Sequence, residues 1–168
     1  MHLYLIRHAL PDYTQSTPYH RPPGPSLVEQ GLTQAAALVP LLSGSGIQRL
    51  AVSPLRRCQM TVEPLVAALN LEVETDDDLI DNQPGEKTTD TNARLLRAIV
   101  NRSDSDVIAL CSHAAPLENL LRYLTRDQVE LPAKDQRGCH VREGSVWRVV
   151  LRNGVWQARP LPSGGFNA

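Results

Sequence analysis

Short continuous apolar runs alternate with helical patterns along this chain. Three runs of strand length occur, at residues 3–6, 50–52 and 107–111. Because these runs lack polar alternation, we expect strands that are buried on both faces, as in a parallel sheet. Apolar residues recur at helical spacing over residues 30–43, 54–69, 92–101 and 116–124. This alternation of strands and helices predicts an α/β fold.

The C-terminal part of the sequence has the pattern of a hairpin. Apolar residues at 146–151 and 155–158 flank Asn153-Gly154, a dipeptide typical of a two-residue hairpin turn. Residues 71–75 indicate one more short strand. We therefore expect a single domain over residues 1–168. Its architecture should be a three-layer sandwich with a mostly parallel central sheet and helices on both faces.

Three segments break these regular patterns. Residues 11–26 contain five prolines and predict an ordered loop or flap over the end of the first strand. Residues 76–92 are acidic and polar, and they predict a loop beside the functional site. Residues 125–143 are charged and irregular, which is typical of a lid or a sheet edge. Ser53 is expected to cap the helix that follows, with Pro54 at its first position.

Composition narrows the class of protein. A chain of 168 residues that is 42% hydrophobic is sufficient for one domain with a core, and its net charge of −1 gives no indication of nucleic-acid binding. No apolar stretch is long enough to cross a membrane, and Arg7 makes the N-terminal run a poor signal peptide. Cys58, Cys111 and Cys139 lack paired spacing, which argues against a disulfide framework. We expect a cytoplasmic protein without nucleic-acid or membrane partners.

Cationic side chains and histidines follow three of the predicted strands. Arg7-His8 ends the first run, Arg56-Arg57 follows the second, and Ser112-His113 follows the third. Ligands bind at the carboxyl ends of the strands in open α/β sheets, so these side chains should lie together. Arginine recognises phosphate through a planar fork of donors, and histidine can attack phosphorus or transfer protons. The pattern predicts a phosphate site.

Three blocks of sequence extend this pattern: residues 5–9 (Leu-Ile-Arg-His-Ala), 53–61 (Ser-Pro-Leu-Arg-Arg-Cys-Gln-Met-Thr) and 111–115 (Cys-Ser-His-Ala-Ala). In this order they resemble the signature blocks of the histidine phosphatase superfamily, which includes the phosphoglycerate mutases and many small phosphatases. Residues 27–35 are similar to the stretch that leads into the family's first helix. The resemblance implies a phosphoglycerate mutase-like fold, with this chain closest in size to the small phosphohistidine phosphatases. It also implies that no metal or organic cofactor is used.

The resemblance also implies roles for individual residues. His8 would be the nucleophile that forms a phosphohistidine, and Arg7 and Arg57 would clamp the phosphate. The family spacing favours Arg57 over its neighbour Arg56. His113 would contact the phosphate and stabilise the transition state, so it is expected in both the catalytic and the phosphate-binding sets.

A general acid is needed to protonate an alkoxide leaving group. Family enzymes often carry this acid after a leucine between the second and third blocks, so Asp81, after Leu79-Ile80, is the expected residue. Glu86 is the alternative, and some small members that resemble this chain lack a clear acid. The chain departs from the family at Ala9 and Ala114-Ala115, where many members have glycine.

These residues favour hydrolysis of a phosphate monoester, or of phosphohistidine, through a phosphohistidine on His8. The substrate would be a small phosphorylated molecule or a phosphoprotein. One alternative is mutase-type phosphoryl transfer, for which the chain is short. Another is a non-catalytic phosphate-binding or interaction module, which the presence of all four residues Arg7, His8, Arg57 and His113 disfavours. Zinc binding is disfavoured because the histidines and cysteines lack metal-ligand spacing.

Overall fold

One mixed sheet forms the centre of the computed structural model, which describes residues 1–162. Its strand order is β3-β2-β4-β1-β5-β6. The strands are β1 (His2–Arg7), β2 (Arg49–Val52), β3 (Val73–Thr75), β4 (Val107–Ser112), β5 (Val146–Arg152) and β6 (Val155–Pro160). The pairings among β1, β2, β3 and β4 are parallel, whereas β5 and β6 are antiparallel to their neighbours. The predicted mostly parallel sheet is confirmed; residues 163–168 of the predicted domain lie outside the described residues.

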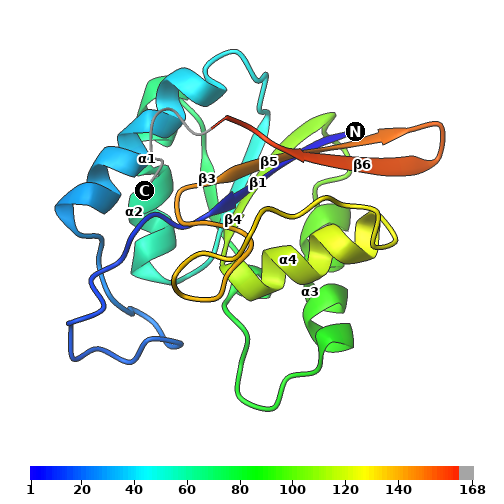
Figure 1. Cartoon of the computed structure of the whole chain (residues 1–168). Coiled ribbons are helices and arrows are strands. Elements are labelled where there is room, and N and C mark those ends of the chain that lie inside the picture. Colours follow the sequence, from blue (N-terminus) through cyan, green and yellow to red (C-terminus); the bar gives the residue numbers. More distant parts are fainter. Residues whose placement is uncertain (163–168) are drawn as a thin grey trace.

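Helices cover both faces of the sheet (Figure 1). The helices α1 (Glu29–Leu42) and α2 (Arg56–Leu69) pack on one face, and α3 (Thr88–Val100) and α4 (Ala114–Leu124) pack on the other. Alternate residues of each central strand point to opposite faces, so the core divides into two apolar clusters. Ile6 and Leu50 pack with α1 and α2, whereas Leu5 and Leu110 pack with α3 and α4. The three-layer α/β sandwich is thereby confirmed.

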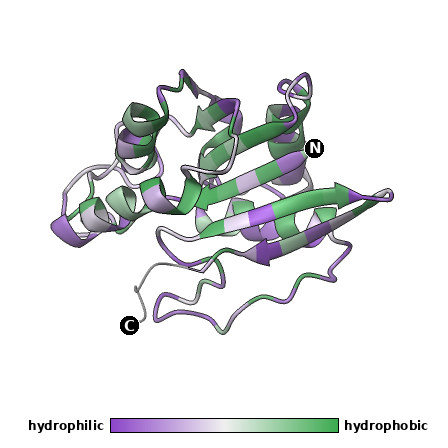
Figure 2. Cartoon of the chain, turned by 90° about the horizontal axis from the view of Figure 1, so that it is seen from above, coloured by the Kyte–Doolittle hydropathy of each residue, from purple (hydrophilic) through white to green (hydrophobic). Residues whose placement is uncertain are grey.

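The distribution of hydropathy follows this layering. The central strands are mostly hydrophobic along their length, while polar residues lie on the outward sides of the helices and in the loops (Figure 2). Within residues 1–162, none of the helices has the length and apolar character needed to cross a bilayer. The hairpin turn is confirmed as well, because Asn153 and Gly154 have φ angles of 50° and 78°, as a two-residue primed turn requires.

The predicted start of α2 is wrong. The helix begins at Arg56, its N-cap residue is Leu55, and no side chain caps it. The backbone amide of Arg56 instead donates to the carbonyl of Pro23 at 2.7 Å, so the 11–26 loop supplies the missing partner. The Ser53 hydroxyl is directed to His113 Nε2, at 2.9 Å. A tertiary contact therefore replaces the local cap.

The strand register brings three strand ends to one edge of the sheet. Arg7 of β1 pairs with Ser112 of β4, and Val52 of β2 pairs with Cys111 of β4. Beyond these pairs, the amide of His8 donates to the carbonyl of Ser112 at 3.0 Å. The three predicted site segments consequently emerge side by side.

Candidate active site

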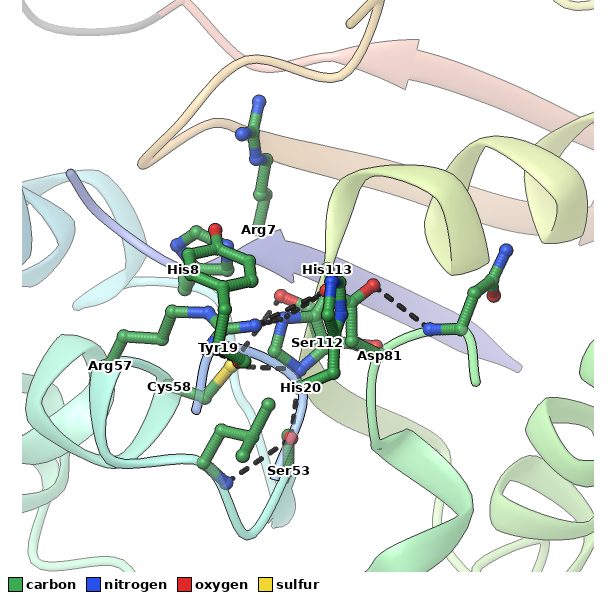
Figure 3. A network of polar contacts seen from close by, with 12 residues as sticks. Arg7, His8, Tyr19, His20, Ser53, Arg57, Cys58, Asp81, Ser112 and His113 are labelled. Carbon is green, nitrogen blue, oxygen red and sulfur yellow. Dashed lines mark hydrogen bonds and ion pairs between the residues drawn. The ribbon is translucent and has the colours of Figure 1, made fainter. Parts of the chain in front are cut away.

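Two histidines and one arginine converge at this edge (Figure 3). His8 follows β1, His113 is the N-cap residue of α4, and Arg57 lies in the first turn of α2. The ring centroids of the two histidines are 5.2 Å apart, and an Arg57 terminal nitrogen lies 3.0 Å from His113 Nδ1. All three side chains are at most 2% exposed. The structure thus brings together three of the predicted site residues in a buried cluster.

The hydrogen bonding of His8 leaves one ring nitrogen free. Its Nδ1 lies 2.8 Å from the carbonyl oxygen of Ala9, which can only accept, so Nδ1 carries the proton. Nε2 therefore holds a lone pair, and it makes no hydrogen bond within residues 1–162. Burial, and then the charges of Arg57 and Arg7, hold the pKa of His8 well below its usual value. A neutral imidazole with a free Nε2 is the form that can act as a nucleophile.

His113 has the opposite arrangement. Arg57 can only donate, so Nδ1 of His113 accepts and Nε2 carries the proton, directed at the Ser53 hydroxyl. Burial lowers the pKa of His113 well below its usual value, and the neighbouring His8 and Arg57 lower it further. Ser53 is therefore a residue that orients the site. The sequence pattern assigned it only to helix capping.

Arg57 and Asp81 form the polar centre of the cluster. The Arg57 guanidinium donates to Asp81 Oδ2 at 3.2 Å and to the carbonyl of Tyr19 at 2.8 Å. The same Asp81 oxygen lies 3.2 Å from Nδ1 of His20. Arg56, one residue earlier, is exposed. The structure therefore separates the two arginines and brings Asp81 into the cluster, while the role of Arg57 as a phosphate clamp stays a prediction.

The alternative acid, Glu86, has a different set of contacts. It accepts from Arg94 Nε at 2.7 Å and from the amide of Gln83 at 3.0 Å, and it does not line the cavity that contains His8. Ser112 holds the same acidic segment from β4, because its hydroxyl donates to the carbonyl of Leu79 at 2.7 Å. Ser112 thereby fixes the backbone two residues before Asp81.

Arg7 lies at the opposite side of the site. Its terminal nitrogens donate to the carbonyl of Val141 at 2.6 Å, to Glu143 at 3.2 Å and to Asp135 at 3.4 Å. The predicted lid segment, residues 125–143, thus folds back onto the end of β1. Arg7 lines the cavity, and its role as a phosphate clamp stays a prediction.

A cavity of about 390 Å³ lies over the cluster. It is lined by Arg7, His8, Asp81 and His113, with Tyr13 and Tyr19 of the 11–26 loop among its other lining residues. A hollow of about 450 Å³ beside α2 and β3 contains none of these side chains. Neither tyrosine was predicted as a site residue. The available signal was that two of the chain's four tyrosines fall within this one loop.

The alanines that replace family glycines are compatible with the backbone. Ala114 and Ala115 begin α4 and line the cavity. Neither they nor Ala9 is among the residues with positive φ, so no left-handed backbone demands glycine there. Among residues 1–162 there is no group of three or more His, Cys, Asp or Glu side chains arranged to hold a metal ion.

Part of the chain is similar in sequence to a curated protein. The curated protein Rv0525 of Mycobacterium tuberculosis, described as uncharacterized, is 38% identical over 80 residues, which are 48% of this chain and 40% of that protein. The match therefore spans less than half of that relative's length.

Solved structures share the fold over nearly the whole chain. A mycobacterial glucosyl-3-phosphoglycerate phosphatase in complex with VO3 has a TM-score of 0.78 at 18% identity, covering 97% of this chain and 99% of that one. The alpha-ribazole phosphatase from Shigella flexneri has a TM-score of 0.73 at 21% identity, covering 96% of each chain. The protein histidine phosphatase SixA, complexed with tungstate, has a TM-score of 0.69 at 21% identity, covering 95% and 94%.

A family model gives the remaining comparison. Residues 3–93, just over half of the chain, match the model of the histidine phosphatase superfamily, branch 1. This span contains His8, Arg57 and Asp81, and the solved structures show that the rest of the chain continues the same fold. The chain belongs to branch 1 of the histidine phosphatase superfamily.

Proposed function

We propose that this protein is a metal-independent phosphatase that hydrolyses phosphate monoesters, or phosphohistidine, through a phosphohistidine on His8. The observation that carries the proposal is the state of His8, which is buried and neutral with a free Nε2. Arg57 and His113 lie beside it with the charge and hydrogen-bonding groups that phosphoryl transfer requires.

The first half of the reaction transfers the phosphoryl group to His8. Nε2 attacks phosphorus, the bond to the leaving oxygen breaks, and that oxygen takes a proton from Asp81. Arg57 and His113 contact the equatorial oxygens, with Arg7 as a further phosphate contact. The Nε atoms of Arg7 and Arg57 are buried without a partner in the described residues, and an anion would satisfy such donors.

Asp81 changes partners during this step. In the free site its carboxylate is held by Arg57 and lies beside His20. An incoming phosphate displaces Asp81 from Arg57, and Asp81 enters the step as the carboxylic acid, with a proton taken from solvent. After transfer, the Asp81 carboxylate takes a proton from the water that attacks phosphorus. The bond between phosphorus and His8 Nε2 breaks, inorganic phosphate leaves, and neutral His8 is restored.

The range of substrates is proposed from the similar structures. Their names give a glucosyl-3-phosphoglycerate, an alpha-ribazole phosphate and a protein phosphohistidine as substrates of those proteins. A small phosphorylated metabolite or a phosphoprotein is therefore the substrate class proposed for this chain. Release of inorganic phosphate distinguishes hydrolysis from mutase-type transfer and from a non-catalytic phosphate-binding module.

A rapid-quench experiment with ³²P-labelled substrate tests the mechanism. We expect an acid-labile, base-stable phosphate on His8 and undiminished turnover in EDTA. His8→Ala should lose both the label and nearly all turnover while keeping its circular dichroism spectrum. His140→Ala is the matched control, since His140 lies outside the cavity and bonds to the carbonyl of Pro132. Near-normal turnover of His8→Ala would end the proposal.

A further inference from the structure

One residue of the 11–26 loop, Tyr19, makes two kinds of contact with Arg57. The ring of Tyr19 lies 4.1 Å from Arg57 Cζ, and its backbone carbonyl accepts from an Arg57 terminal nitrogen at 2.8 Å (Figure 3). A guanidinium over an aromatic ring is attracted by the negative face of the ring, and more strongly where water is excluded. Arg57 is fully buried. Tyr19 therefore restrains the cation through both its ring and its backbone.

The contact is extended outward by a second tyrosine. The rings of Tyr13 and Tyr19 are stacked, with centroids 5.7 Å apart and planes inclined by 13°. Arg137, from the 125–143 segment, lies with its Cζ 3.4 Å from the Tyr13 ring centre. The Tyr13 hydroxyl donates to Glu143, which also binds Arg7. The stack therefore connects the two loops that border the cavity.

The residue next to Tyr19 contacts the proposed acid. His20 Nδ1 lies 3.2 Å from Asp81 Oδ2, and the rings of Tyr19 and His20 meet edge to face at 5.1 Å. The same short stretch of loop thus contacts both Arg57 and Asp81. The path of this loop and the position of the Arg57 guanidinium are therefore linked by direct contacts.

We propose that Tyr19 is a positioning residue for Arg57. The inference rests on the phosphatase function proposed above. An arginine has several rotatable bonds, and phosphoryl transfer depends on fixed cations at the equatorial oxygens. The Tyr19 ring and carbonyl hold the guanidinium where it meets both His113 and the incoming phosphate. Loss of the ring should therefore damage transition-state stabilisation more than substrate binding.

Steady-state kinetics and vanadate titration calorimetry on three variants test this role. Tyr19→Leu should lower kcat about tenfold, with a smaller change in KM, and weaken vanadate binding about tenfold. Tyr19→Phe keeps the ring and should stay within about twofold of the wild type. Tyr123→Leu is the matched control, since Tyr123 is an exposed tyrosine on α4 outside the cavity.

A double-mutant cycle shows whether Tyr19 acts through Arg57. In an Arg57→Ala background, Tyr19→Leu should cause no further loss beyond about twofold. A tenfold loss in both backgrounds, equal damage from Phe and Leu, or unchanged kinetics and vanadate binding in Tyr19→Leu would each overturn the inference. Absence of turnover in the wild type would refute the proposed function instead. The vanadate affinities of the same variants would then still decide the role of Tyr19.

Discussion

At the scale of single residues, position in the helix decides what an arginine does. Arg56 and Arg57 are adjacent in α2, and successive residues of a helix point in directions about 100° apart. Arg57 points inward and is fully buried, whereas Arg56 is exposed. The same rotation leaves only Arg57 in contact with His113 and Asp81.

The two arginines should differ sharply in activity assays. Arg57→Ala should lower kcat/KM by about 100-fold or more, because a transition-state charge in a buried site loses its donor. Arg56→Ala should stay within about threefold of the wild type. Steady-state kinetics on both variants measures the difference, and the reverse order would show that the second signature block has been misaligned by one residue.

Substrates with different leaving groups can distinguish a role of Asp81 as general acid from a role in binding or structure. If it protonates the leaving oxygen, Asp81→Asn should reduce turnover of an alkyl phosphate by about 100-fold or more. The loss on p-nitrophenyl phosphate should be much smaller, because nitrophenolate is a stable anion that leaves without a proton. Both rates come from phosphate-release assays on one variant preparation. Equal losses on the two substrates would assign Asp81 to binding or structure.

At the scale of elements, one glycine sets how the chain enters the site. After His8 the backbone passes α1 so closely that a Cβ built on Gly31 would lie 2.2 Å from the carbonyl oxygen of Leu10. The Leu10 carbonyl also accepts from the amide of Val28. The Leu10 amide donates to the side-chain oxygen of Gln34 at 2.8 Å. This crossing fixes the start of the 11–26 loop. The atoms that a Cβ on Gly31 would meet are the backbone O, C and N of Leu10, which cannot move aside easily.

Gly31→Ala should therefore destabilise the protein by about 3 kcal/mol, since the added methyl group meets backbone oxygen rather than a flexible side chain. Gly44→Ala is the matched control because nothing lies within 4 Å of its built Cβ. That change should be neutral or stabilise by about 0.5 kcal/mol. Urea unfolding gives both free energies. A Gly31→Ala protein as stable as Gly44→Ala would disprove the close crossing.

At the scale of the whole molecule, burial of the two histidines links stability to pH. Burial lowers the pKa values of His8 and His113 well below the value of about 6.5 expected in the unfolded chain. Below pH 6.5 the unfolded chain therefore binds protons that the folded protein does not. The free energy of unfolding consequently decreases as the pH falls, and the full stability is present above pH 6.5.

The free energy of unfolding should fall between about pH 6.5 and 5 with a slope of up to ~1.4 kcal/mol per pH unit for each histidine. Urea titrations across this range measure the slope. A protein carrying His8→Gln and His113→Gln together should show a flatter dependence over the same interval. If both proteins show the same slope, the two histidines are not the groups that titrate.

The sequence by itself determined the sheet and the helices around it, and it indicated which residues gather at the candidate site; their roles toward phosphate stay predictions. Continuous apolar runs require burial on both faces, and helical periodicity defines which faces cover them. Because parallel strands end at one edge, His8, Arg57 and His113 could be placed together before any distance was known. Each of these inferences depends on the order of apolar and polar residues within a short stretch of sequence.

Tertiary structure decided the contacts between loops, where no periodicity exists. Ser53 was expected to cap a helix, yet its hydroxyl lies 2.9 Å from His113 Nε2, and the first amide of α2 donates to the carbonyl of Pro23 in the 11–26 loop. Tyr19 and His20 approach Arg57 and Asp81 only through the path of the 11–26 loop. The carboxylates on Arg7 come from more than 120 residues away in sequence. Such pairings depend on chain path and side-chain packing, which a one-dimensional pattern does not encode.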